Sequence, residues 1–188
     1  GMQCASLLVK YSAAQIICNR ISSSESSSYT LFGVVNYYSD STLSGNEIIA
    51  NSVSVTGELS CLSCGVQYSG DGVLINNLIV AGNASGGIGM STSESFGLNI
   101  NSGNPLVINN TIVGGNATTI SATACSYGLC NGSDCFPLNI NNIIMTNDLA
   151  GDSFGIYGSG VNGSGTDDDD DNYHYNCIYS NSGTNYTG

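Results

Sequence analysis

Cysteine thiols offer the most obvious chemistry in this sequence. The chain contains eight of them, at Cys4, Cys18, Cys61, Cys64, Cys125, Cys130, Cys135 and Cys177. Thiols can bind zinc, but the CxxC unit at 61–64 has no second CxxC, and the chain holds one histidine to complete a site. An even number of cysteines beside only two basic residues favours disulfides in an oxidising compartment instead.

The cysteine pairing is only partly constrained by the sequence, because eight cysteines allow 105 pairings. The pairs that we predict are Cys4 with Cys18, Cys61 with Cys64, and two of Cys125, Cys130 and Cys135. Any cysteine left over could bridge two molecules.

A run of five acids is the one dense charge cluster, at Asp167, Asp168, Asp169, Asp170 and Asp171. Oxygen-rich loops can bind calcium, so these carboxylates are candidate calcium ligands. Their spacing matches neither an EF-hand loop nor a glycine-rich calcium repeat. The alternative is a solvated acidic loop, which is the usual role of a charge run.

Glycan attachment is the third kind of chemistry that the sequence allows. Six Asn-x-Ser/Thr sequons occur, at Asn83, Asn109, Asn116, Asn131, Asn162 and Asn185. Four of them fall in predicted loops, where glycan is most easily carried: Asn83, Asn116, Asn131 and Asn162. Asn109 lies next to the repeated asparagine described below and is less favoured.

A short motif, Ile-x-Asn-x-Ile/Val, recurs along the chain and must position all of these residues. Its central asparagines are 32, 26, 33, 32 and 34 residues apart, at Asn19, Asn51, Asn77, Asn110, Asn142 and Asn176. A repeat of about 20–50 residues indicates a solenoid, a propeller or an array.

A second motif falls once in each interval: an aromatic residue or cysteine, then glycine, then an aliphatic residue. Its glycines are Gly33, Gly65, Gly97, Gly128 and Gly155. The segments around both motifs alternate apolar and polar residues, and no interval has a helical period. Each repeat is therefore an all-β unit that must stack on its neighbours to bury its apolar side.

These repeats, together with the late segment Tyr173-His-Tyr-Asn-Cys-Ile-Tyr179, resemble those of the pectin-lyase-like superfamily of right-handed parallel β-helices. The resemblance covers roughly residues 14–182. It implies coils of two or three short parallel strands, with an inward asparagine at one turn that stacks on its equivalents. We therefore expect an all-β, right-handed parallel β-helix of about six coils with an internal asparagine ladder.

The physics of a buried amide agrees with this ladder. In an extended chain, the residues two before and two after each asparagine point to the same side as the asparagine. An unsatisfied buried amide costs about 1–3 kcal/mol, whereas amides stacked about 4.8 Å apart can donate to one another. Asparagine also tolerates the left-handed backbone of a sharp corner. The alternative is that the Asn-Asn pairs only mark surface turns.

The repeat register excludes one disulfide. Cys18 and Cys177 lie in the first and last predicted coils, about 24 Å apart at 4.8 Å per coil. This separation exceeds the roughly 7 Å between the Cα atoms of a disulfide, so these two cysteines cannot pair within one molecule.

The composition limits the classes of partner that the protein can bind. The chain has 2 Lys plus Arg against 14 Asp plus Glu, a net charge of −12, so we expect binding neither to nucleic acid nor to anionic membranes. Charged residues are 9% of the chain, and its polarity comes from Ser, Thr, Asn and Gly. No apolar run reaches the 18 or more residues of a membrane span. We predict an extracellular or cell-surface protein.

The chain divides into residues 1–13, a partial rung or N-terminal extension, and one β-helix domain over residues 14–188 with an acidic loop at 165–172. A parallel β-helix has unpaired strand edges at both ends, which soluble proteins cover with a helix, a loop or charge. The sequence shows no amphipathic helix at either end. Either caps lie outside this chain, or another molecule supplies the next coil; the alternative is that a loop of this chain caps the end.

The family resemblance includes polysaccharide lyases and glycoside hydrolases, but the residues argue against an enzyme. Lyases of this kind use an Arg or Lys base, and the chain has only Lys10 and Arg20, both in its first rungs. The hydrolase motifs Gly-His-Gly and Arg-x-Lys are absent. We therefore predict no catalytic residues and no cofactor, calcium excepted.

The function that we predict is structural. The chain is expected to stack head to tail on copies of itself, as the building block of an extracellular fibre or a cell-surface adhesin. The alternative is a carbohydrate-binding or polysaccharide-cleaving module of a larger enzyme, for which glycans would be the partners.

Overall fold

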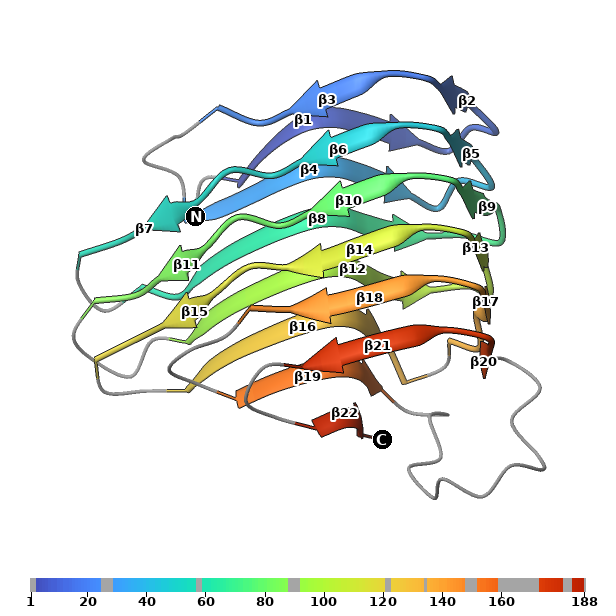
Figure 1. Cartoon of the computed structure of the whole chain (residues 1–188). Coiled ribbons are helices and arrows are strands. Elements are labelled where there is room, and N and C mark those ends of the chain that lie inside the picture. Colours follow the sequence, from blue (N-terminus) through green and yellow to red (C-terminus); the bar gives the residue numbers. More distant parts are fainter. Residues whose placement is uncertain are drawn as a thin grey trace.

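The computed structural model describes residues 3–24, 29–56, 59–87, 92–120, 123–133, 135–147, 152–158, 173–180 and 184–187. All regular structure in these residues is β-strand, and all strand pairs are parallel. Coil after coil stacks along one axis as a parallel β-solenoid (Figure 1). None of the described residues forms a helix long and apolar enough to cross a membrane.

Four sheets run along the solenoid. The largest, sheet A, contains β1 (Gln3–Lys10), β4 (Thr30–Tyr37), β8 (Cys61–Ser69), β12 (Ser93–Ser102), β16 (Ala124–Asn131), β19 (Asp152–Gly158) and β22 (Thr184–Thr187). Sheet B contains β2 (Gln15–Ile17), β5 (Thr42–Ser44), β9 (Val73–Ile75), β13 (Leu106–Ile108), β17 (Leu138–Ile140) and β20 (Tyr173–His174).

The other two sheets complete the coil. Sheet C contains β3 (Arg20–Ser22), β6 (Glu47–Ile49), β10 (Leu78–Val80), β14 (Thr111–Gly114), β18 (Ile143–Thr146) and β21 (Cys177–Ser180). Sheet D contains β7 (Val53–Ser54), β11 (Ala84–Ser85) and β15 (Ala117–Thr118). The solenoid has about four turns, compared with about six coils predicted. The outer coils have strands in sheets A, B and C but, among the described residues, none in sheet D.

The corner between sheets B and C corrects one detail of the predicted repeat. The residue before each repeated asparagine has a left-handed backbone, as at Asn76, Asn109 and Asn141, with φ of 56°, 53° and 54°. This turn reverses the alternation, so the inward residue lies three positions before the asparagine, as Val107 does, and not two. Asparagine is one of the few residues that adopts this conformation at low cost.

The core is a set of columns of aliphatic side chains inside the coils. The isoleucine two positions after each repeated asparagine is fully buried in the middle coils, at Ile48, Ile79, Ile112 and Ile144. Direct register across β6, β10, β14 and β18 places these side chains one above another. Because every coil contributes the same residue type at the same place, one continuous core forms.

The glycine motif is explained by this isoleucine column. A Cβ atom added at Gly97 would lie 2.7 Å from Cγ2 of Ile112 and 2.6 Å from the carbonyl oxygen of Gly128. The same two contacts recur at Gly33 and Gly65. Glycine is required at this position because the isoleucine of sheet C packs directly on the backbone of sheet A.

The strands of sheet A also change face at the glycine. In β8, Ser63 and Val66 both lie in the interior although they are three positions apart, so the strand bends at Gly65. The bend gathers the outward side chains before the glycine into a second apolar cluster, at Phe32, Cys64, Phe96, Cys125 and Tyr127. The rings of Phe96 and Tyr127 stack with centroids 4.7 Å apart and planes 6° apart.

This geometry predicts that Gly97→Ala destabilises the fold. The new methyl group would overlap Ile112 and the backbone of the next coil, which should cost about 1–3 kcal/mol of unfolding free energy. Urea unfolding followed by circular dichroism measures the loss. Asn99→Ala, on the outer side of the same strand, is the control and should change stability by less than about 0.5 kcal/mol. Equal stability of Gly97→Ala and the natural protein would refute the close contact.

Candidate functional site

The candidate site is a column of asparagines that runs along the whole solenoid at the corner between sheets B and C. In each coil, the backbone N–H of the asparagine donates to Oδ1 of the asparagine in the next coil. The five N···Oδ1 distances are 2.8–2.9 Å and join Asn19, Asn46, Asn77, Asn110, Asn142 and Asn176. The four middle members are 1–2% exposed. The column is thus a buried and fully connected ladder.

The second coil corrects the sequence prediction. Asn46 is the ladder residue there, and Asn51 lies five positions later, outside the column. Asn51 instead donates its side-chain amide to the carbonyl oxygen of Ser23. The motif at 49–53 matched the repeat by coincidence, whereas the true register has Ser44 where the other coils have isoleucine or histidine. With Asn46 the spacings become 27, 31, 33, 32 and 34 residues.

Each amide nitrogen makes two further bonds. One N–H of Asn110 Nδ2 donates to Asn142 Oδ1 at 3.2 Å, toward the C-terminal coil. The other N–H points back and donates to the carbonyl oxygen of Leu74 at 2.9 Å. The same pattern recurs at Asn46, Asn77 and Asn142. Each of these four amides therefore accepts from the preceding coil and donates to the following coil.

This regularity gives the ladder a direction. At all five junctions, the donors belong to the coil nearer the N-terminus and Oδ1 belongs to the coil nearer the C-terminus. Hydrogen bonds aligned in one direction polarise one another. The two ends of the ladder are consequently different: one end presents an acceptor, and the other presents donors.

The acceptor end lies in the first coil. No described residue donates to Oδ1 of Asn19, and Asn19 itself is exposed. Around it, β1, β2 and β3 enclose an open hollow of about 510 Å³ whose apolar lining is Leu7, Ile16 and Ile21. Leu7 and Ile21 pack on the core but stay partly exposed. The first coil therefore exposes the cross-section of the core.

The donor end lies at Asn176. Its Nδ2 reaches back to the carbonyl oxygen of Asn139 at 3.0 Å, and its Oδ1 accepts from Asn142. The backbone N–H of Asn176 donates to none of the described residues. In the same coil, Ile178 continues the isoleucine column and is partly exposed. This end therefore offers the groups that the first coil lacks.

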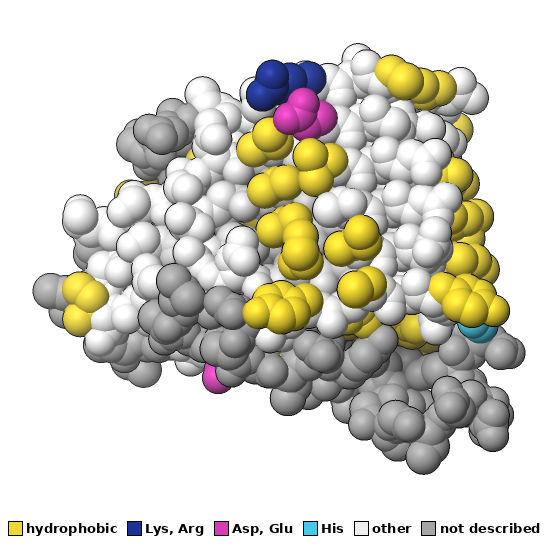
Figure 2. Space-filling view, viewed as in Figure 1, with side chains coloured by type: hydrophobic (Ala, Val, Ile, Leu, Met, Phe, Trp, Pro, Cys, Tyr) yellow, Lys and Arg dark blue, Asp and Glu magenta, His cyan; other side chains and the backbone are white. Residues whose placement is uncertain are grey.

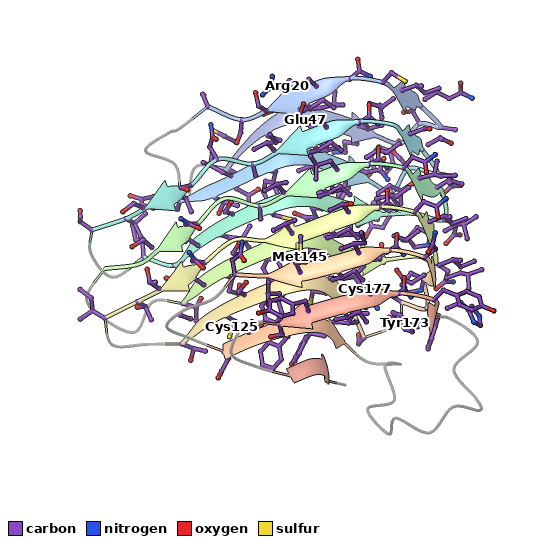
Figure 3. The ribbon with its side chains drawn as sticks, in the orientation of Figure 1. Arg20, Glu47, Cys125, Met145, Tyr173 and Cys177 are labelled. Atoms are coloured by element: carbon purple, nitrogen blue, oxygen red, sulfur yellow. The ribbon has the colours of Figure 1, made fainter. Side chains whose placement is uncertain are left out.

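The predicted disulfides are not formed, although all eight cysteines lie in described parts of the chain. Cys61 and Cys64 belong to one extended strand, β8, in which three residues span about 10 Å, beyond disulfide reach. Cys125 and Cys130 share β16 in the same way. Cys135 lies in the main core, whereas Cys130 packs on the outer cluster. Cys4, Cys18 and Cys177 are exposed; Figure 3 labels Cys177 and Cys125.

Burial makes several thiols poor nucleophiles. It raises the pKa of Cys64, with a smaller contribution from nearby Cys130. It also raises the pKa of Cys130 to about 12, helped by the negative charge of Glu94. The pKa of Glu94 is itself raised by burial. These groups sit in the outer cluster of sheet A, where their neutral forms are favoured.

The sequons differ in accessibility. Asn83 is exposed, and its Oδ1 accepts from the backbone of Asn116 at 2.9 Å. Asn109 is exposed at the corner, and its Oδ1 accepts from Asn141 at 2.7 Å. Asn116 is half-buried. Asn131 is 4% exposed at the end of β16 and donates to the hydroxyl of Tyr173, so it does not lie in an exposed loop as predicted, and glycan there stays a prediction.

Three other predictions concern the sequons at Asn162 and Asn185 and the acidic run. Asn162 and the acidic run Asp167 to Asp171 lie outside the described residues, and Asn185 lies in β22. Among the residues that the structure does describe, no three His, Cys, Asp or Glu side chains are grouped to hold a metal ion. Calcium binding by the acidic run stays a prediction.

A column of buried serines in sheet A was not predicted from the sequence. Ser95 Oγ donates to the carbonyl oxygen of Gly82 at 2.9 Å and accepts from the backbone N–H of Gly115 at 2.8 Å. Ser63 and Ser126 make equivalent contacts with the same segment of their coils. The sequence does contain a sign of this column: in four repeats, a serine lies two residues before the glycine of the second motif. These hydroxyls fasten sheet A to the segments that follow sheet C.

The ladder predicts unequal costs for two asparagine substitutions. Asn110→Ala leaves both donors of Asn77 and the carbonyl oxygen of Leu74 without partners in the interior, which should lower the unfolding free energy by about 3 kcal/mol. Asn51→Ala removes one bond from a half-buried side chain and should cost less than about 1 kcal/mol. Urea unfolding compares the two variants. Similar losses would contradict the assignment of the ladder.

The thiols should react at very different rates. With a pKa raised from 9.0 to about 12, Cys130 holds about a thousandfold less thiolate at pH 8 than an ordinary cysteine. We expect iodoacetamide to modify Cys18 and Cys177 in the native protein and to reach Cys130 only after unfolding. Peptide mass spectrometry identifies the modified residues. Rapid native modification of Cys130 would show that the outer cluster is open.

Comparisons with family models, with curated proteins and with solved structures found no match to this chain. What is shown is therefore a parallel β-solenoid, without a family assignment.

Proposed function

We propose that this protein is an extracellular structural β-solenoid that stacks head to tail on copies of itself. The observation that carries the proposal is the direction of the asparagine ladder. Among the described residues, none donates to Oδ1 of its first member, Asn19, and none accepts from the backbone N–H of its last member, Asn176. A second copy placed end to end continues the column in the direction that all five internal junctions follow.

The apolar end faces support the same arrangement. Ile21 and Ile178 are the first and last members of the isoleucine column, and both are partly exposed. A junction between two copies would bury each against the other and close the hollow beside Leu7. Burial of apolar surface supplies the free energy, while the ladder supplies the alignment. The strand edges of the end coils would pair as the internal strands do.

The opposite arrangement is disfavoured. Two first coils placed face to face would bring two Oδ1 acceptors together with no donor between them. Two last coils would oppose donors in the same way. Only head-to-tail contact pairs unlike ends, and such a contact does not close on itself, so it builds a filament. Sheets B and C each contain six strands, so stacking at about 4.8 Å per strand gives an axial rise of about 29 Å per subunit.

The alternative, a carbohydrate module, has one observation in its favour. Tyr11, Tyr37 and Tyr38 form an exposed cluster of rings, with Lys10 Nζ 5.1 and 5.2 Å from the centroids of Tyr11 and Tyr37. The longer aromatic column on sheet A offers little surface, because Phe96 and Tyr127 are 6% and 7% exposed. We therefore prefer the structural role.

Blocking one end at a time tests the proposal. Ile21→Asp places a charge in the first coil, and Ile178→Asp places one in the last. Every head-to-tail junction of either variant with itself contains one charged end, so we expect each variant alone to stay monomeric while the natural protein forms filaments. An equimolar mixture retains one good junction and should give dimers. Sedimentation velocity distinguishes the three states.

The control for a general effect of charge is Ser54→Asp, on the outer side of sheet D, which should assemble as the natural protein does. Dimers of Ile178→Asp by itself would mean that first coils meet each other, contrary to the proposal. A natural protein that stays monomeric at all concentrations tested would also overturn it.

A further inference from the structure

The outer side of sheet C carries an apolar surface that end-to-end stacking leaves uncovered. Its outward apolar residues in β6, β10, β14 and β18 are Ile49, Leu78, Val80, Val113, Ile143 and Met145, which we call the front face. Leu78 and Ile143 are 39% and 47% exposed. Figure 2 shows hydrophobic side chains gathered in a stripe down this side of the molecule, and Figure 3 labels Met145 within it.

Isolated exposed apolar residues are ordinary, but aligned ones are not. Parallel pairing in direct register places Ile49, Val80, Val113 and Met145 in one column, about 4.8 Å apart. Leu78 and Ile143 belong to a second column, with Thr111 between them. The front face is therefore continuous, and the repeat that builds the core also builds this surface.

The charges around the front face favour a second copy of this chain as its partner. The chain has a net charge of −12, which makes most approaches of two copies repulsive. On sheet C, however, the outward charges of β3 and β6 are Arg20 and Glu47, and they pair with each other at 3.3 Å. Two copies can bring their front faces together without opposing like charges.

The size of the surface indicates when this contact forms. Two columns about 7 Å apart over four coils cover on the order of 200 Å² per copy, well below the roughly 800 Å² per partner of a stable interface. One pair of molecules is therefore too weakly held to persist. A stack of copies repeats the surface along its length, so the contacts add up along two filaments.

We propose that the front face joins neighbouring filaments side by side, through contact of sheet C with sheet C of another copy. The two sheets would meet about 10 Å apart, with the aliphatic columns interdigitated and no hydrogen-bond ladder across the contact. This inference rests on the proposed end-to-end assembly, which supplies the repetition. It adds a second and chemically different surface: the ends extend a filament, and the front face bundles filaments.

Electron microscopy of filaments tests the inference. The natural protein should form paired or bundled filaments. Ile143→Lys adds a charge at an exposed position of the front face and should give single filaments with the same axial rise. Leu78→Lys is a second variant with the same expectation. Ser54→Lys, on the exposed outer side of sheet D, is the matched control and should leave the bundles intact.

The outcomes separate the two proposals. Single filaments of the natural protein, or bundles that persist in both Ile143→Lys and Leu78→Lys, would overturn lateral contact while leaving end-to-end stacking in place. Natural filaments that stay single in buffer but collect on uncharged lipid vesicles would show that the front face binds lipid instead. Absence of filaments would overturn end-to-end stacking, and this inference with it.

Discussion

A buried amide without partners costs about 1–3 kcal/mol, and this chain buries four of them in a row, at Asn46, Asn77, Asn110 and Asn142. The burial is tolerable because each amide oxygen accepts two hydrogen bonds and each amide nitrogen donates two. These bonds exist only if neighbouring coils stay in direct register. The ladder therefore fixes the register of sheets B and C, and every other column in the solenoid follows from it.

Two backbone features depend on that register. The left-handed residue before each ladder asparagine turns the chain so that the amide points inward, and a second asparagine takes this position in three coils, at Asn76, Asn109 and Asn141. Across the core, the glycine of sheet A leaves room for the isoleucine that lies two positions after each ladder asparagine. A one-residue slip in any coil would break the ladder and drive a side chain into the isoleucine at the same time. Satisfied hydrogen bonds and close packing thus specify the same register.

The sequence predicted the architecture well because the repeat is dense in specific residues. Asn19, Asn77, Asn110, Asn142 and Asn176 all lie in the ladder. The error at Asn51 arose because a five-residue motif can match by chance in a chain rich in asparagine and isoleucine. The prediction that Ile108 points inward was wrong, because side chains alternate strictly between the two faces only where no residue has a left-handed backbone.

Cysteine pairing could not be predicted from closeness in sequence. Cys61 and Cys64 are near each other in the chain, but they lie on opposite sides of one strand. Burial of Asn131 depends on contact with distant Tyr173, which no local pattern reveals.

The direction of the ladder bears on how such a fold can be limited in length. A stack of identical coils has no internal reason to stop, because each added coil forms the same bonds as the last. Length is then set where the column meets a residue that cannot continue it. Within this chain, polar or aromatic residues enter core positions near the last coils, as Asn139 and Tyr173 do in the column that holds Leu74 and Val107 in earlier coils. The isoleucine column and the amide column nevertheless continue through Ile178 and Asn176. The residues of sheet B thus change type in these coils, whereas the isoleucine column and the amide column keep theirs at the neighbouring corner.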